Sequence, residues 1–195
     1  MSENTKDHKA KGAMMVALAM VVNSTRNLDW IKAGLSEADL QIIHNGIISS
    51  RWYERAFWER ISLAVYMLVG QGKPENAFQF GHGLLAETLL KIYQGPLAID
   101  DAREIIGKFA IFYGSTWYNF GKAEFKSTTK GGVFSVIHED GIPIPECFVP
   151  MIRGVLSRLV EDNHGRNVKA ECGEEYQIMT QKLTRLNIEL SWDQD

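Results

Sequence analysis

The sequence predicts an α+β fold in which an N-terminal helical half packs on a four-stranded antiparallel sheet. Over residues 12–118 the apolar residues recur mainly at helical spacing, whereas residues 122–192 follow the order strand, strand, helix, strand, strand. Helices that come first and a sheet that comes last are typical of α+β domains. We therefore expect a single domain over residues 10–195, preceded by a polar, disordered stretch at residues 1–9.

The size and composition are those of one ordinary globular domain. The chain has 195 residues, 45% hydrophobic and 23% charged, and a net charge of −3; it is long enough to bury a sizeable core without disulfides. This charge gives no electrostatic case for binding nucleic acid. Cys147 and Cys172 are too few for a disulfide scaffold, which favours a reducing cytoplasm. The apolar run at residues 12–22 is too short to span a membrane and lacks a signal-peptide cleavage site.

The first helices are predicted from their apolar residues and their capping residues. Residues 12–22 form a helix that is apolar all round, so we expect it to be buried on most sides. A short helical piece follows at residues 28–34. Ser36 then caps a helix over residues 37–44, which Asn45-Gly46 ends.

Three longer helices complete the helical half. Residues 52–69 have a polar face in the first turns and an apolar second half, which we expect to enter the core. A break rich in glycine and proline separates this helix from the next, over residues 75–93. Asp100 or Asp101 caps the last helix, which runs to about residue 118.

The C-terminal half alternates apolar and polar residues in its strands and shows helical spacing in one segment. A turn at Gly131-Gly132 joins the first two strands as a hairpin. For residues 173–184 the pattern leaves open an extra strand or a mobile loop. The predicted elements are strands at residues 122–129, 133–138, 168–172 and 185–192 and a helix at residues 147–160, which Gly165 ends.

Three parts of the chain resemble an uncharacterised family of small proteins abundant in myxobacteria and their relatives: residues 11–18, residues 46–53, and the ending at residues 147–168 and 186–192. That family is distantly similar to the ligand-binding fold shared by H-NOX haem domains, vinyl-reductase-like regulatory domains and TRAPP trafficking subunits. The resemblance implies helices over a four-stranded antiparallel sheet, with an apolar cavity between them. It also implies binding, regulation or assembly more often than catalysis.

Large apolar residues are frequent in the helical half, and core packing accounts for most of them. The alternative is that some of them, with residues of the first two strands, line a pocket between helices and sheet, because small-molecule sites are predominantly apolar. The candidate pocket residues are Phe57, Tyr66, Phe78, Phe109, Phe112, Phe125 and Phe134.

Haem is implied by the resemblance but is poorly supported by the residues. H-NOX relatives hold haem through a helix histidine, and His82 is the candidate here. The Tyr-x-Ser-x-Arg element of H-NOX domains, which grips the haem propionates, would fall on the first strand, where residues 125–129 are Phe-Lys-Ser-Thr-Thr. Threonine cannot replace arginine as a bidentate partner of a carboxylate. We therefore expect no cofactor.

The residues likewise give no pattern for a metal site or for catalysis. Vinyl-reductase-like domains often end with paired cysteines, and only Cys172 lies in that region. Cys147, Cys172, His138 and His164 follow no recognised zinc spacing. The acidic pairs at residues 100–101 and 174–175 are typical of a helix start and a solvated segment. We expect neither a metal site nor an enzyme.

The leading hypothesis is a non-enzymatic, cytoplasmic regulatory, sensor or carrier domain that binds a hydrophobic small molecule, such as a lipid or acyl chain, between helices and sheet. The alternative is an interaction module for signalling that binds no ligand and uses Trp30, Trp52, Tyr53 and Trp192 as an exposed patch. A haem-based gas sensor is a third hypothesis. A homodimer is compatible with the first two hypotheses.

Overall fold

The computed structural model describes residues 7–139, 141–173, 177–180 and 182–194. Its main sheet is antiparallel and has the order β3-β4-β7-β5, with β6 also paired to β7. This arrangement confirms the predicted α+β fold and adds a fifth strand within residues 173–184. The strands are β3 (Gly121–Thr128), β4 (Gly131–Glu139), β5 (Gly165–Glu171), β6 (Gln177–Met179) and β7 (Leu183–Gln194).

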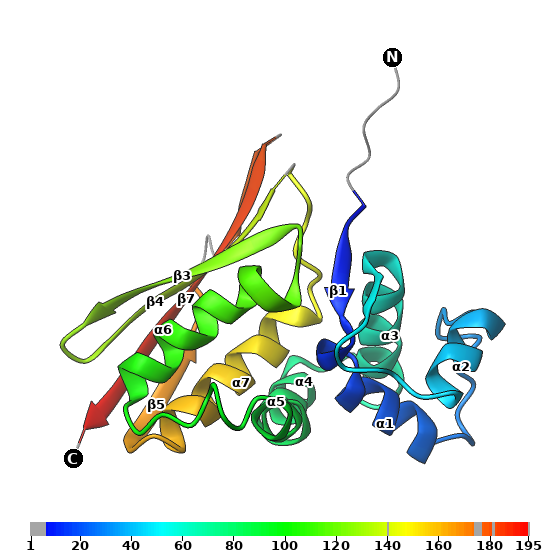
Figure 1. Cartoon of the computed structure of the whole chain (residues 1–195), viewed down its shortest axis with the longest axis horizontal. Coiled ribbons are helices and arrows are strands. Elements are labelled where there is room, and N and C mark those ends of the chain that lie inside the picture. Colours follow the sequence, from blue (N-terminus) through cyan, green and yellow to red (C-terminus); the bar gives the residue numbers. More distant parts are fainter. Residues whose placement is uncertain (1–6, 140, 174–176, 181, 195) are drawn as a thin grey trace.

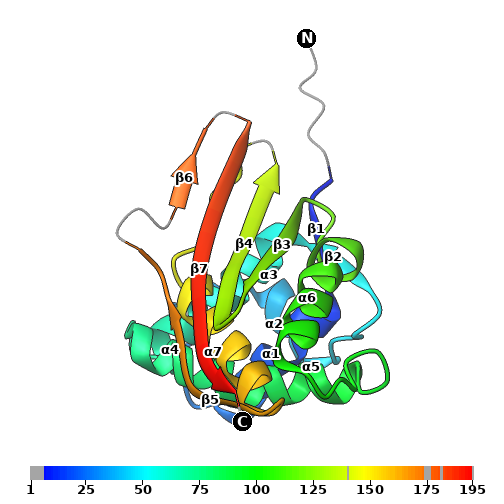
Figure 2. The ribbon, with the colours of Figure 1, turned by 90° about the vertical axis from the view of Figure 1, so that its left-hand side faces the viewer.

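Two helices lie against one face of this sheet, and the other helices extend the molecule away from it (Figure 1). The two packed helices are α6 (Ala102–Phe112) and α7 (Phe148–Glu161). Figure 2 shows the sheet in front of the helices, with α4 beside α7. The remaining helices are α1 (Val16–Ser24), α2 (Glu37–His44), α3 (Arg55–Leu68), α4 (Pro74–Phe80) and α5 (Ala86–Ile92).

The hairpin of β3 and β4 forms as predicted, but its two glycines do not make the turn. Gly131 and Gly132 both belong to β4, and the turn is made by the two residues before them, Thr129 and Lys130. Gly131 has φ +146°, and a Cβ there would lie 2.8 Å from the carbonyl carbon of Leu190. The glycine is therefore required by the close approach of β7 rather than by the turn.

A short two-stranded sheet between the start of the chain and the third helix was not predicted. β1 (Lys9–Lys11) pairs with β2 (Trp52–Glu54), so the helix expected at residues 52–69 begins only at Arg55. The backbone N–H of Arg55 donates to His8. The predicted disorder at residues 1–9 is therefore wrong for Lys9, and residues 1–6 lie outside the described residues. Residues 28–34 form turns instead of the predicted helical piece.

The expected helix over residues 75–93 is a continuous run of α4, a π-helical turn η2 (Gly81–Leu85) and α5. Similarly, α6 continues into a second π-helical turn, η3 (Tyr113–Trp117). Two glycines let the first run approach α7 closely. A Cβ on Gly81 would lie 2.7 Å from the carbonyl carbon of Met151, and a Cβ on Gly154 would lie 2.6 Å from the backbone nitrogen of His82. This contact fixes α4 against α7.

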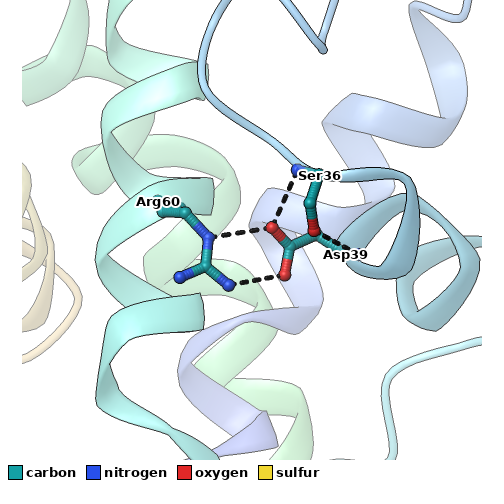
Figure 3. A network of polar contacts seen from close by, with 3 residues as sticks. All are labelled: Ser36, Asp39 and Arg60. Atoms are coloured by element: carbon teal, nitrogen blue, oxygen red, sulfur yellow. Dashed lines mark hydrogen bonds and ion pairs between the residues drawn. The ribbon is translucent and has the colours of Figure 1, made fainter.

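The predicted cap of α2 is confirmed and has a second role. Ser36 and Asp39 form a reciprocal capping box, in which each side chain accepts a hydrogen bond from the backbone N–H of the other. The buried carboxylate of Asp39 also accepts two hydrogen bonds from Arg60 on α3, at 2.8 and 2.7 Å (Figure 3). The bidentate pair ties α2 to α3. In the part of the chain that the structure describes, none of the helices is long and apolar enough to cross a bilayer.

Candidate functional site

Buried aromatic side chains pack against one another between the helical half and the sheet. The Trp58 and Tyr118 rings lie 5.2 Å apart, and those of Tyr118 and Phe120 lie 5.3 Å apart. The rings of Phe109 and Trp117 are 4.7 Å apart, and all five side chains are at most 2% exposed. These edge-to-face and tilted contacts are the preferred packing of aromatic rings. They occupy the region in which the sequence predicted an apolar cavity.

A buried histidine–tyrosine pair lies among these rings. His138 on β4 is fully buried, and its Nε2 is 2.8 Å from the hydroxyl of Tyr113. Burial, helped by the positive charge of Arg55, lowers the pKa of His138 to about 4. Burial also raises the pKa of Tyr113. Both side chains are therefore neutral at pH 7, and they stabilise the core without a charge.

The residues at the predicted haem position do not fit a haem. An axial histidine needs a ring nitrogen directed into a cavity large enough for the porphyrin. The Nε2 atom of His82 lies 2.6 Å from Glu161 at the end of α7, and the ring stacks on Phe78 with 6.1 Å between centroids. The side chain of His82 is 27% exposed. It forms part of a surface contact between η2 and α7, with its Nε2 atom directed to a carboxylate.

The structure spreads the seven candidate pocket residues over several parts of the molecule. Phe109 and Phe134 face each other in the core with 6.0 Å between ring centroids. Phe57 packs under Tyr53 at 5.9 Å. The other four are Phe112 beside Tyr93 and Trp117, Phe125 beside Gly132 on the sheet, and Tyr66 and Phe78, which line neighbouring hollows of one surface groove.

That surface groove is the candidate site, and we call it the Arg153 groove. One hollow of about 360 Å³ and an adjoining one of about 340 Å³ share Pro74 and Arg153. The groove lies where the end of α3, the start of α4, the first turns of α7 and the chain after β5 meet. Its wall residues are Tyr66, Pro74, Phe78, Val149, Pro150, Arg153 and Cys172, with Glu75, Gln79, Glu146 and Gly173 at its edges.

Arg153 is the polar group at the junction of the two hollows. Its Nε donates to the carbonyl oxygen of Ala170 on β5 at 2.6 Å, which holds the guanidinium in place. The structure gives its two terminal amino groups no hydrogen bond or ion pair with any described residue. The sequence pattern places Arg153 on a helix but carries no signal that connects it with Tyr66 or Phe78, because the groove joins segments far apart in the chain.

Neither cysteine has the character of a reactive thiol. Burial raises the pKa of Cys172, against a smaller lowering by the charge of Arg153. Burial likewise raises the pKa of Cys147 to about 11. Both thiols are therefore protonated at neutral pH, and a protonated thiol is a weak nucleophile. Among the described residues, no three histidine, cysteine, aspartate or glutamate side chains are grouped as a metal site.

The exposed aromatic patch predicted for an interaction module is not formed. Trp30, Tyr53 and Trp192 are 4%, 9% and 3% exposed. The indole of Trp30 donates to the carbonyl of Thr25, and the Tyr53 hydroxyl accepts from the backbone of Ile48. The patch prediction is wrong because these rings fill gaps between local turns and the core, which leaves Trp52 as the only one of the four that is exposed.

Comparisons with known proteins identify the fold. No protein-family model and no curated protein matches the chain. Among solved structures, an oxygen-binding H-NOX domain related to soluble guanylate cyclases matches with a TM-score of 0.59 and 11% identity, covering 93% of this chain and 92% of that one. A mutant Cs H-NOX gives a TM-score of 0.62 at 11% identity, covering 94% of this chain and 96% of that one. A mutant H-NOX of T. tengcongensis gives 0.60 at 11% identity, covering 94% and 97%. The chain therefore has an H-NOX-like fold.

Proposed function

We propose that this H-NOX-like domain is a non-enzymatic sensor or carrier that binds a hydrophobic small molecule in the Arg153 groove. The ligand class is that of a lipid or acyl chain. The proposal moves the site from the space between helices and sheet, where buried aromatic rings pack, to the boundary of α3, α4, α7 and β5. The aromatic core would then serve as the rigid support of the site.

The observation that carries the proposal is the composition and size of the groove. Small-molecule sites usually have volumes of about 300–1,000 Å³, with mainly apolar walls and few polar groups. The two hollows, of about 360 and 340 Å³, fall within this range. Tyr66, Phe78 and Val149 supply apolar wall surface. The polar part of the lining is Arg153, which both hollows share, with Glu75, Gln79 and Glu146.

The proposal that the domain is not an enzyme has separate support. The thiol of Cys172 in the groove has a raised pKa, so it is a poor nucleophile. The histidine with a strongly perturbed pKa, His138, lies in the filled core and not in the groove. The guanidinium of Arg153, held by the carbonyl of Ala170, is suited to orienting a ligand.

A groove-filling variant tests the proposal. Gly173 lines the larger hollow, and a Cβ there has no neighbour within 4 Å, so a side chain can be added at this position without a clash at its Cβ. We expect the neutral dye Nile red to bind with enhanced fluorescence, and Gly173→Phe to weaken binding by about tenfold, since it covers apolar wall area. Gly173→Ala is the matched control and should bind as the wild type does. Equal dye binding by all three proteins, or no binding, would refute the proposal.

Self-association belongs to the same proposal and has its own measurement. A homodimer, or docking into a larger signalling complex, would give the bound ligand an output. Size-exclusion chromatography with light scattering measures the mass in solution. A mass of 22.0 kDa at all protein concentrations would contradict the homodimer and leave the groove unaffected.

A further inference from the structure

We infer that the ligand of the Arg153 groove carries a carboxylate head, which binds the guanidinium of Arg153, and an apolar tail that lies along the groove. This inference rests on the proposed function and names the chemical class of the ligand. It follows from how Arg153 is held, from what its terminal groups face, and from the walls on either side.

The guanidinium is positioned by one hydrogen bond, which leaves its outer edge for a ligand. The Nε atom is used by the Ala170 carbonyl at 2.6 Å. Arg153 lines both hollows, and its two terminal amino groups have no partner among the residues that the structure describes. A fixed, planar guanidinium with two open N–H donors matches the two oxygens of a carboxylate. Because the side chain is already held, little rotamer freedom is lost on binding.

The walls on both sides of Arg153 suit an alkyl chain. On one side Tyr66, Val149 and Pro150 line the larger hollow, and on the other Phe78 and Pro74 line the smaller one. Tyr66 is fixed by a hydrogen bond from its hydroxyl to the carbonyl of Gly72 at 2.7 Å. An anionic head at the junction therefore places a tail of several methylene groups against an apolar wall in either direction, each buried methylene adding to the affinity.

Two glutamates at the groove edges do not neutralise the site. Glu75 and Glu146 are both exposed, so their charges are screened by water. Neither is ion-paired to Arg153 in the structure described. Glu146 directly precedes the N-terminal turns of α7, whose positive end offsets its charge. Their remaining repulsion favours a ligand with one negative charge over a ligand with two.

Calorimetric titration at pH 8 with decanoate and decan-1-ol, below the concentrations at which they aggregate, tests the inference. The two probes share the tail and differ in the head. We expect decanoate to bind at least about tenfold more tightly, as for a hydrogen-bonded charge. Arg153→Met keeps the aliphatic stem and should remove this preference. Arg158→Met is the control, since Arg158 lies on the same helix and pairs with Asp162 outside the groove.

The outcomes separate the inference from the proposed function. Equal binding of both probes to the wild type would overturn the carboxylate head and leave the groove as a hydrophobic site. No binding of either probe would overturn both. Arg153→Met also loses the hydrogen bond to Ala170, so its unfolding curve must be recorded. If it does not fold, Arg153→Lys decides: we expect it to fold and to bind decanoate several-fold more weakly, because an ammonium cannot make the bidentate contact.

Discussion

Replacing Gly154 with alanine tests the contact that holds α4 against α7 and shapes one wall of the groove. The added Cβ would lie 2.6 Å from the backbone nitrogen of His82 and closer still to the carbonyl oxygen of Phe78. Ordinary carbon contacts are about 3.5–4.0 Å, so the helices must separate by roughly 1 Å. Both neighbours are backbone atoms, which cannot move away by a change of rotamer.

The expected effect combines two opposing terms. Overpacking in a tight contact costs about 1–3 kcal/mol, and the alanine gains about 1 kcal/mol of helix propensity. Because backbone atoms lie on both sides of the added methyl group, we take the upper end of the overpacking range. The free energy of unfolding should therefore fall by about 2 kcal/mol in total. For a chain of this size the melting temperature should fall by about 4–8 °C.

Urea unfolding followed by tryptophan fluorescence measures this change, with Gly107→Ala as the matched control. Gly107 lies within α6, and a Cβ there meets nothing within 4 Å. The control should therefore stabilise the protein by about 0.5–1 kcal/mol. A Gly154→Ala protein as stable as the wild type, with an unchanged urea dependence, would refute the close packing of α4 on α7.

Two predictions concern pH. Burial alone would raise the pKa of Asp39, but hydrogen bonds from Arg60 and Ser36 outweigh it and the pKa is lowered. The pair therefore stabilises the folded state above the ordinary carboxyl pKa, and this stability is lost as the pH falls through the folded value. Asp39→Asn should cost about 1–2 kcal/mol at pH 7 and less at pH 2–3 in urea unfolding. Burial lowers the pKa of His138 from 6.5 to about 4. Between these values only the unfolded state takes up the proton, so stability should fall by about 3 kcal/mol as the pH drops. His138→Gln should lose this part of the pH dependence; an identical pH profile in the variant would contradict burial of a neutral His138.

Local signals predicted the elements whose formation depends on neighbouring residues. Ser36 and Asp101 were among the predicted caps, and both accept hydrogen bonds from the first turns of their helices. The pairing of β1 with β2 was missed because each strand has three residues and they lie far apart in sequence. Gly81 and Gly154 also gave no usable signal, since a glycine in a helical pattern does not reveal the helix it contacts.

Only the kind of residue that lines the site could be predicted from the sequence, and not its position in the fold. Tyr66 and Phe78 were among the candidate pocket residues, and both line the groove. The sequence could not show how the interior rings pack, because the same aromatic composition can pack solidly or enclose a cavity. In the sequence, Arg153 is one of several charged residues on an amphipathic helix. Only the structure shows the carbonyl of Ala170 on β5 beside it.

The central claim is that the Arg153 groove binds the ligand, and an amide NMR titration of the ¹⁵N-labelled protein with decanoate tests it most directly. The account predicts that the shifted resonances cluster at residues 66–79, 149–153 and 170–173, around the guanidinium. Shifts concentrated around Tyr113 and His138, in the interior between helices and sheet, or no shifts at millimolar decanoate, would contradict it.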